Sequence, residues 1–466
     1  MTTTYRIEKD SMGEVKVPQN ALYQAQTQRA VENFPISGLT IGPLVIRALG
    51  IIKKCAAAAN QELGLIKPEI SHYIQAAAQE VIDGKWDNQF PIDIFQTGSG
   101  TSSNMNANEV VASRANQLIQ EQKLDLKIHP NDHVNFGQSS NDVYPTALRI
   151  AARIAIETNL FPAMDELVKE LSTIASKYAG IAKTGKTHLM DAMPVTFKQV
   201  FGAHAHMVKM GAARVKSSLE RLSELPQGGT AVGTGINTHV DFGNVFAKCV
   251  SKVTGYAFTE AVDHFEAQGT LDAPAETSAQ LKTFACSLMK IVNDFRWMNS
   301  GPNSGVAEIE IAPLQPGSSI MPGKVNPVIE ESAAMVCAQV IGNDAAITIG
   351  AQSGNFELNV MVPMVAQNLI QSINLLGNSC RNFAKMSVSK VKINEKNVQD
   401  KLYKNPILVT ALNPIIGYDL AAKIAKKSYA ENRSLLEVAK EMTTLTDEQL
   451  RAALDPMKMT KGGFTE

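Results

Sequence analysis

Three long segments of the chain place apolar residues at alternating steps of four and three positions. The segments are residues 150–178, 197–222 and 281–298, and the last of them carries Leu281, Phe284, Leu288, Ile291, Phe295 and Met298. This spacing is a 3.5-residue period, which keeps one apolar face of a helix against partner helices in a left-handed bundle. Such helices are too long for a small globular core. The pattern therefore predicts a rod-like helical bundle whose remaining apolar faces are buried in sister subunits.

Further helices are expected elsewhere, at residues 44–64, 103–120, 326–351 and 359–390. Pro363 lies inside the last of these segments and should bend it, because proline lacks the N–H that a helix interior requires. The chain has 466 residues. A single hydrophobic core rarely serves more than about 250–300 residues, so two or three domains are expected.

The C-terminal part of the chain reads as a small, separate helical domain. Two pairs match the capping box that opens a helix, namely Ser434 with Glu437 and Thr446 with Gln449. The first 140 residues instead mix helices with loops rich in Gly, Pro and Asn. These differences predict a mainly helical protein with distinct N-terminal, central and C-terminal parts.

Charge and cysteine usage restrict the partners and the compartment. The formal net charge is −1, so no global field would recruit nucleic acid or a membrane surface. Five dispersed cysteines fit reduced thiols better than a disulfide framework. No apolar run suggests a membrane span, and the first residues lack the apolar core of a targeting segment. We therefore expect a cytoplasmic protein.

The segment GSSIMPGKVNP, residues 317–327, interrupts the helical pattern. Pro322 cannot continue a helix, and Gly317 and Gly323 permit backbone angles that other residues resist. Lys324 and Asn326 would offer an ammonium and an amide to a carboxylate, and exposed backbone N–H groups of such a loop can surround an oxyanion. The alternative is a plain connector between two helices.

Two other polar segments offer neutral donors. Residues 97–109, TGSGTSSNMNANE, suit an anion at the start of a helix, although they also fit a turn that caps that helix. Residues 129–142, HPNDHVNFGQSSND, repeat the same hydroxyl and amide chemistry. His129 and His133 have the spacing of helical metal ligands, but Pro130 favours a turn, so we do not expect a metal site. No phosphate-binding glycine motif is present.

The fourth polar segment is GKTHLMDAMP, residues 185–194. His188 lies there in a loop bounded by Gly and Pro, and histidine is suited to proton transfer near neutrality. His204 lies on an apolar helical face and is interpreted as a hydrogen-bonded core residue. Together the four segments indicate recognition of a small carboxylate with proton chemistry beside it.

These segments give the chain a family resemblance. GSSIMPGKVNP is similar to the signature of the fumarase/aspartase superfamily, and the other three segments stand in that family's order and spacing. Residues 405–419, NPILVTALNPIIGYD, resemble the fumarase form of the C-terminal segment more than the aspartase form. Over nearly its whole length, the chain resembles the class II fumarases.

The resemblance implies a fold and an assembly. It implies a mainly α, three-domain fumarase/aspartase-like fold with a central bundle of long helices, which forms a twenty-helix core in a homotetramer. The domains would span residues 1–139, 140–392 and 393–466. Each active site would be built from three subunits, which would account for the long apolar helix faces.

The resemblance also implies an activity and the residues that carry it. The activity is the reversible hydration of fumarate to L-malate in the tricarboxylic acid cycle, by anti elimination or addition through a carbanion-like intermediate and without metal or organic cofactor. Ser318 would take the C3 proton of L-malate, His188 would act on the leaving hydroxyl through a water, and Glu331 would partner the histidine. The substrate-binding residues would be Ser99, Gly100, Thr101, Ser139, Ser140, Asn141, Thr187, Ser319, Lys324, Val325 and Asn326. A second dicarboxylate site would comprise His129, Pro130, Asn131 and Asp132.

Two alternatives share the scaffold. Aspartate ammonia-lyase would form fumarate from L-aspartate and differs in the leaving group. A non-catalytic relative, as among lens crystallins, is disfavoured because Ser318, Lys324, Asn326 and His188 are all present. A nucleotide-dependent dehydrogenase is disfavoured because no strand–GxGxxG–helix unit is found.

Overall fold

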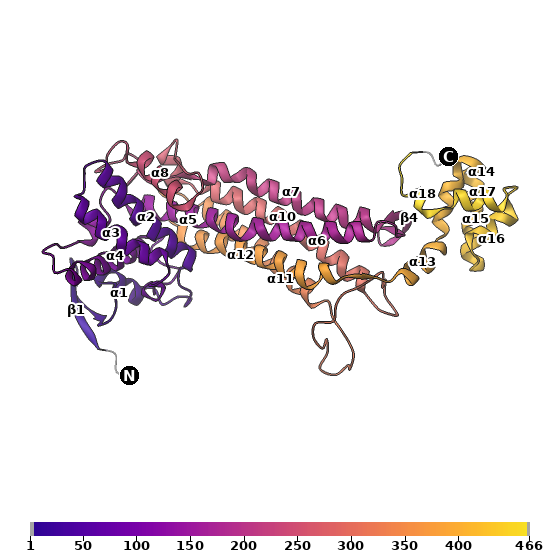
Figure 1. Ribbon diagram of the computed structural model, residues 1–466, viewed down its shortest axis with the longest axis horizontal. Coiled ribbons are helices and arrows are strands. Elements are labelled where there is room, and N and C mark those ends of the chain that lie inside the picture. The colour runs from indigo at the N-terminus through magenta and orange to yellow at the C-terminus, as the bar shows by residue number, and fades with distance from the viewer. Residues whose placement is uncertain (1–3, 464–466) are drawn as a thin grey trace. The chain divides into compact units, whose positions relative to one another are not determined.

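The computed structural model describes residues 4–463, which form long helices and four small two-stranded sheets (Figure 1). The chain divides into two units that are each compact. Unit 1 comprises Met1–Pro162, Ala213–Ala285 and Ala338–Gly377, and unit 2 comprises Ala163–Ala212, Cys286–Cys337 and Asn378–Glu466. The predicted domain boundaries at residues 139/140 and 392/393 remain a prediction.

Unit 1 is built around one apolar helix, α2 (Pro43–Glu62). This helix contacts α3 (Pro68–Ile82), α4 (Thr101–Glu121), α5 (Ser140–Ala155) and α8 (Phe242–Thr254). Its sequence is rich in alanine and aliphatic residues, and Leu49, Ile52 and Cys55 are fully buried. Small side chains let several helices approach one core helix closely, so these residues define the centre of the unit. The elements of unit 1 are β1 (Tyr5–Asp10), β2 (Gly13–Pro18), α1 (Ala25–Asn33), α2 (Pro43–Glu62), α3 (Pro68–Ile82), α4 (Thr101–Glu121), α5 (Ser140–Ala155), β5 (Glu224–Leu225), α8 (Phe242–Thr254), β6 (Thr259–Glu260) and α9 (His264–Gly269).

Unit 2 has an aromatic core and a separate C-terminal core. Phe201 stacks on Phe197, while Phe295 packs against Phe201 and edge-on against Phe383. Such ring contacts add to the burial of apolar area. The elements of unit 2 are α6 (Phe161–Lys177), β3 (Ala182–Thr187), β4 (Met190–Thr196), β7 (Ile309–Glu310), β8 (Lys392–Ile393), α13 (Glu395–Tyr403), α14 (Asn413–Ile416), α15 (Tyr418–Glu431), α16 (Leu435–Met442), α17 (Asp447–Ala453) and α18 (Pro456–Met459).

Four long helices begin in one unit and end in the other: α7 (Phe197–Leu222), α10 (Asp272–Asn299), α11 (Val328–Ala351) and α12 (Val362–Met386). These helices confirm the segments predicted from apolar periodicity. The segment predicted at 150–178 consists of α5 and α6, joined by a π-helical stretch at Ile156–Leu160. Both C-terminal capping boxes are also present.

The bend expected at Pro363 is absent, and that prediction was wrong. α12 begins at Val362, so Pro363 lies in the first turn of the helix. The N–H groups of a first turn have no intrahelical acceptor, and a proline there removes nothing that the helix needs.

One helix among the described residues, α11, is long and apolar enough by length and composition to cross a membrane. No such run was expected from the sequence. The helix carries Glu330 and Glu331 in its first turn, and Asp344 further along bonds to Ser278 and Lys282. Core helices of large bundles pass the same test of hydropathy.

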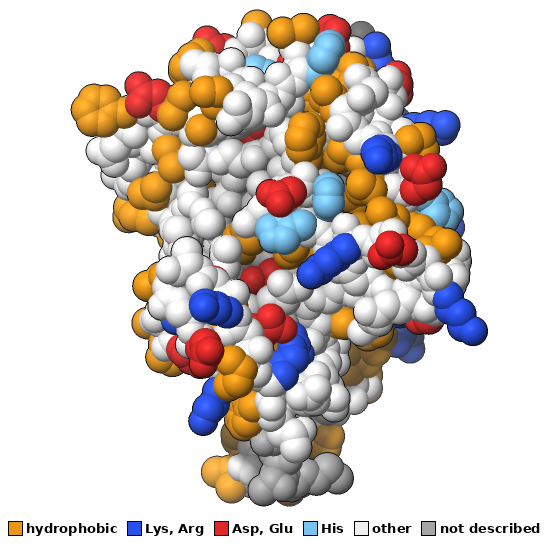
Figure 2. Space-filling model, turned by 90° about the vertical axis from the view of Figure 1, so that its left-hand side faces the viewer, with side chains coloured by type: hydrophobic (Ala, Val, Ile, Leu, Met, Phe, Trp, Pro, Cys, Tyr) orange, Lys and Arg blue, Asp and Glu red, His pale blue; other side chains and the backbone are white. Residues whose placement is uncertain are grey.

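Acidic and basic side chains are interspersed with apolar ones on the face of the molecule that Figure 2 shows.

Candidate active site

The loop of residues 317–326 is closed at its base by two hydrogen bonds. The N–H of Gly317 donates to the carbonyl of Lys324 over 2.7 Å, and Nδ2 of Asn326 donates to the carbonyl of Gly317 over 2.6 Å. A Cβ atom on Gly317 would lie only 2.6 Å from that lysine carbonyl. Only glycine therefore allows this close approach of two backbone segments.

The hydroxyl oxygen of Ser318 sits within this loop on two backbone donors. The N–H of Met321 donates to Oγ over 3.0 Å, and the N–H of Ile320 donates over 3.2 Å. Nζ of Lys324 donates to Oδ1 of Asn326 over 2.8 Å. Backbone N–H groups aimed at one oxygen can stabilise negative charge on it, so the two donors would favour an alkoxide at Ser318 over one without them.

Helix α11 starts directly after the loop. Glu331, predicted as the partner of His188, lies in its first turn, and within residues 4–463 no hydrogen bond or ion pair joins the two side chains. Its neighbour Glu330, which sequence reasoning missed, is fully buried and accepts a hydrogen bond from Oγ of Ser387. Burial raises the pKa of the Glu330 carboxyl.

His188 lies at the tip of the β3–β4 hairpin. Thr187 pairs with Met190, which leaves His188 and Leu189 as a two-residue turn, with φ angles of 54° and 61°. Turns of this kind need positive φ at both positions and usually contain Asn and Gly. Non-glycine residues in this region store backbone strain, and such strain concentrates at functional sites. The exposed imidazole is therefore held by the turn.

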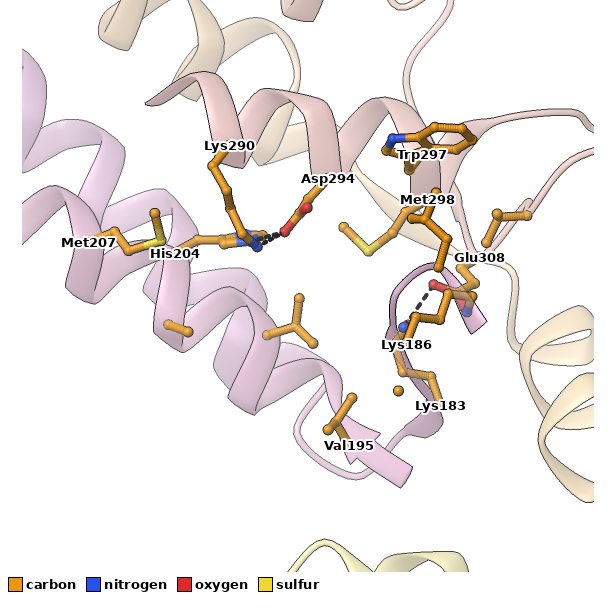
Figure 3. Close-up of a pocket in the computed structure, with 15 residues that line it drawn as sticks. Lys183, Lys186, Val195, His204, Met207, Lys290, Asp294, Trp297, Met298 and Glu308 are labelled. Atoms are coloured by element: carbon orange, nitrogen blue, oxygen red, sulfur yellow. Dashed lines mark hydrogen bonds and ion pairs between the residues drawn. The ribbon is translucent and has the colours of Figure 1, made fainter. Parts of the chain in front are cut away.

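Glu308 holds strand β3 of the hairpin by ion pairs within unit 2. This carboxylate is 3% exposed, and its two oxygens pair with Nζ of Lys183 at 3.0 Å and with Nζ of Lys186 (Figure 3). Burial lowers the pKa of Lys183, while the charge of Glu308 opposes that shift. Both lysines belong to strand β3, so their pairing with one buried acid holds the strand that ends at the histidine turn.

The same residues line a cavity of about 430 Å³ in unit 2. On its opposite wall, Nε2 of His204 bonds to Oδ2 of Asp294 at 2.9 Å, and Lys290 pairs with the same carboxylate (Figure 3). His204 is 1% exposed, and burial lowers its pKa. The interpretation of His204 as a hydrogen-bonded core residue is confirmed.

In unit 1, the residues predicted around Ser99 form the start of α4. Gly100 is the N-cap residue with φ of 76°, and a Cβ there would lie 2.2 Å from the ring of Tyr144. Oγ of Ser99 lies 2.8 Å from Oγ1 of Thr101. The N-cap residue Gly100 offers no side chain to the first turn, where Oε1 of Gln96 accepts a hydrogen bond from the N–H of Ser103 over 3.0 Å. The alternative of a Ser/Thr cap is therefore not observed.

Residues Ser139, Ser140 and Asn141 form the start of α5. Ser139 and Asp142 make a capping box, while Oγ of Ser140 accepts a hydrogen bond of 2.9 Å from Nδ2 of Asn104 in α4. The structure therefore brings the polar starts of α4 and α5 together. Burial raises the pKa of Asp142 to about 6, although three backbone N–H groups oppose the shift.

Behind these two helix starts lies Lys53 of α2, which sequence reasoning did not single out. Its side chain is fully buried, and Nζ donates to Oδ1 of Asn104, Oδ1 of Asn135 and Oε1 of Gln138 over 2.6, 3.1 and 3.0 Å. The only available signal was a lysine within the apolar face of a predicted helix.

The residues of the predicted second site lie in unit 1, at the edge of a short π-helical turn, Pro130–Val134. Nδ1 of His129 accepts hydrogen bonds from the N–H groups of Asn131 and Asp132. The N–H of His129 itself donates to Nδ1 of His133. Across residues 4–463, no three His, Cys, Asp or Glu side chains are grouped as metal ligands.

The predicted active-site residues thus fall into two groups. One group, in unit 1, is Ser99, Gly100, Thr101, Ser139, Ser140 and Asn141, and the other, in unit 2, is Thr187, His188, Ser318, Ser319, Lys324, Val325, Asn326 and Glu331.

Comparison with known proteins gives full-length matches. Residues 13–342 match a family described as lyase, and residues 408–461 match the fumarase C C-terminus. The chain is 53% identical to the class II fumarate hydratase of Xylella fastidiosa over 460 residues, covering 99% of this chain and 96% of the relative. It is 49% identical to that of Halobacterium salinarum over 464 residues, covering 100% and 99%. The crystal structure of recombinant class II fumarase from Schistosoma mansoni superposes with a TM-score of 0.95 at 37% identity, covering 98% of this chain and 99% of that chain.

The fold and the site define a lyase of the fumarase/aspartase type. Within that class, the chain belongs to the class II fumarate hydratase family, as the identity over its whole length shows.

Proposed function

We propose that this enzyme hydrates fumarate reversibly to L-malate and that Ser318 is its base. The observation that carries the proposal is the pair of backbone N–H groups at Oγ of Ser318. A serine hydroxyl is a poor base unless its alkoxide is stabilised. The two N–H groups would supply part of that stabilisation, and Lys324 of the same loop would add a positive charge to the site.

In the direction of elimination, the Ser318 alkoxide takes the proton from C3 of L-malate. The electron pair of that C–H bond moves onto the adjacent carboxylate, where Lys324 and Asn326 stabilise the added charge. The pair then forms the C2–C3 double bond as the C2–O bond breaks. The hydroxyl leaves as water with a proton that His188 supplies through a bound water, and Glu331 partners this histidine. None of these steps requires a metal or an organic cofactor.

Both substrate carboxylates need donors. The hydroxyls and amides at the starts of α4 and α5 would hold one of them, because the neutral donors and backbone N–H groups of helix starts favour anions. Thr187, Ser319, Lys324, Val325 and Asn326 would complete the site from the hairpin and the loop. His129, Pro130, Asn131 and Asp132 would bind a second dicarboxylate outside this site.

We propose a homotetramer with a twenty-helix core, in which three subunits build each active site. Large apolar side chains on α11 support this assembly, since Met335 is 68% exposed and Ile349 is 56% exposed in the single chain. Large apolar side chains exposed along one helix would be buried if that helix packed against sister subunits. The five free cysteines support a reducing cytoplasmic location, where the enzyme would serve the tricarboxylic acid cycle.

Subunit complementation tests the shared site. Ser140→Ala and Ser318→Ala tetramers are each expected to be nearly inactive. If the two serines of a site come from different subunits, mixed tetramers refolded from equal amounts should recover about a quarter of the wild-type activity, because about one site in four receives both intact residues. Mixtures that stay as inactive as their parents would refute sharing of these two residues.

Aspartate ammonia-lyase is the alternative, and the names of the full-length relatives do not favour it. Separate incubations with L-malate and L-aspartate, followed by fumarate absorbance, distinguish the two activities. We expect fumarate from L-malate alone, and fumarate from L-aspartate alone would reverse the assignment.

A further inference from the structure

The most unusual charge in unit 1 is that of Lys53. Its side chain is fully buried, and no ion pair joins it to a carboxylate among residues 4–463. Its three acceptors are the amide oxygens of Asn104, Asn135 and Gln138. A buried cation is costly unless it is paired or fully hydrogen-bonded, so a lysine held only by amide dipoles calls for a functional reason.

The nearest acidic group does not neutralise it by contact. Asp142 influences Lys53 through space, but its carboxylate accepts hydrogen bonds from the N–H groups of Ser139, Gly228 and Thr230. That carboxylate is therefore occupied by the start of α5 and by the loop before α8. Burial lowers the pKa of Lys53 to about 7, and the charge of Asp142 opposes that shift only through space, so a further anion nearby would stabilise the ammonium form.

A chain of hydrogen bonds leads from this ammonium to a predicted substrate-binding hydroxyl. Lys53 donates to Oδ1 of Asn104 over 2.6 Å, and Nδ2 of the same amide donates to Oγ of Ser140 over 2.9 Å. A cation on the amide oxygen polarises the amide and strengthens its N–H as a donor. Because Oγ of Ser140 already accepts this bond, its own proton is free to point at a ligand.

The amide orientation is set from both sides. Asn104 also donates to Oδ1 of Asn135 over 3.2 Å, and that oxygen accepts from Lys53 and from Nδ2 of Asn108 as well. An oxygen of Asn104 facing the ammonium leaves its Nδ2 facing Ser140. The charge of Lys53 thus fixes the direction of the whole chain of hydrogen bonds.

We propose that Lys53 is a positioning residue for the substrate: acting through Asn104, it makes Ser140 a hydrogen-bond donor and lends positive charge to the carboxylate bound at the starts of α4 and α5. The inference rests on the proposed function, which places a substrate carboxylate at Ser140. It explains how a group of neutral side chains can hold one carboxylate of the substrate in a protein whose net charge is close to zero.

Three variants test the proposal with succinate, a saturated dicarboxylate, as the probe for calorimetric titration. Lys53→Met keeps the length of the side chain and removes the charge. Asn104→Leu interrupts the chain of hydrogen bonds and leaves the lysine in place. Lys54→Met is the matched control, because Lys54 belongs to the same helix but bonds to Gln79 of α3 over 2.6 Å.

We expect Lys53→Met and Asn104→Leu each to raise the Kd of succinate and the KM for L-malate by about tenfold or more, the size expected for a hydrogen bond to a charged group. The kcat should change less than threefold, and the control should change neither constant. A merely structural role would lower kcat as well. If Lys53→Met does not assemble, Asn104→Leu carries the same test.

A double-mutant cycle with Ser140→Ala separates this inference from the proposed function. Once Ser140 is absent, the loss from Lys53→Met should shrink to less than about a third of its value in the wild type, because the two residues act together. Independent, multiplying effects, or an unchanged Kd for Lys53→Met or Asn104→Leu, would overturn the role of Lys53. An unchanged Kd for Ser140→Ala would instead overturn the assignment of Ser140 to the substrate.

Discussion

The backbone N–H of Met321 donates a hydrogen bond to Oγ of Ser318 over 3.0 Å. Ile320 donates a second bond to the same oxygen, so a serine on an exposed loop has the surroundings of an oxyanion. The loop holds this geometry because its base is narrow, with Gly317 against the carbonyl of Lys324. The chemistry of the serine therefore depends on a glycine next to it.

Gly317→Ala should lower kcat at least about tenfold without unfolding the protein. The added Cβ would lie 2.6 Å from the carbonyl of Lys324 and 2.9 Å from the N of Asn326, so the base of the loop must open and misplace the donors. Steady-state kinetics with L-malate measures the effect. Gly180→Ala is the control, because nothing lies within 4 Å of its Cβ, and equal kinetics for the two variants would contradict the prediction.

Leu189→Gly should stabilise the protein by about 0.5–1 kcal/mol, since glycine relieves the positive φ of the turn residue at some entropic cost. The φ angle of Leu189 is 61° and its side chain is 66% exposed. Urea unfolding at fixed protein concentration measures the change. Leu189→Ala removes the side chain but keeps the strain, and a similar gain in this control would show that strain is not the cause.

Glu308→Gln should destabilise the protein by about 3 kcal/mol, because it leaves two lysines without their shared buried carboxylate. It should also lower kcat, since Lys183 and Lys186 hold the strand that leads to His188. Urea unfolding and turnover of L-malate report the two effects. Adding Lys183→Met to Glu308→Gln should restore part of the stability. A Glu308→Gln protein as stable as the wild type would show that the ion pairs of Glu308 with the two lysines do not stabilise the fold.

Asp142 gives a pH dependence of stability with a defined sign. Its pKa is raised by burial from 3.8 to about 6, so the folded state binds more protons than the unfolded state between these values. The stability from protonated Asp142 is fully present below pH 3.8 and is lost as the pH rises through about 6. Lys53 is the charged group that acts on it.

The stability of Asp142→Asn relative to the wild type should therefore increase as the pH rises. The difference in free energy of unfolding between the two proteins should move in favour of the variant by about 2–3 kcal/mol between pH 4 and pH 7. Urea unfolding across this range gives the difference directly. A difference that stays constant with pH would mean that Asp142 titrates normally.

Much of the fold could be predicted from local pattern. The apolar period places the helix over residues 197–222 where α7 is found, because one face of a long helix repeats its environment. The capping boxes at Ser434 and Thr446 could be predicted for the same reason, because each is formed by residues close together in the sequence. The effect of Pro363 was predicted wrongly because it depends on where the helix begins. A proline bends a helix from its interior but not from its first turn, and the sequence did not locate the first residue of α12.

The candidate site could be proposed from the sequence where one contiguous segment carries it, as in residues 317–327. Lys53 and Glu308 were missed because their partners are distant in sequence: Asn135 lies 82 residues from Lys53, and Lys186 lies 122 residues from Glu308. A side chain that acts by holding another leaves no local pattern, and only the fold reveals it.

The turnover of L-malate by Ser318→Ala is the sharpest test of Ser318 as the base. If the Ser318 alkoxide removes the C3 proton, kcat should fall by about 10³-fold, within the range for loss of a general base, while succinate binds as to the wild type and the assembly is unchanged. An intact Ser318→Ala enzyme whose kcat lies within threefold of the wild type would contradict the account.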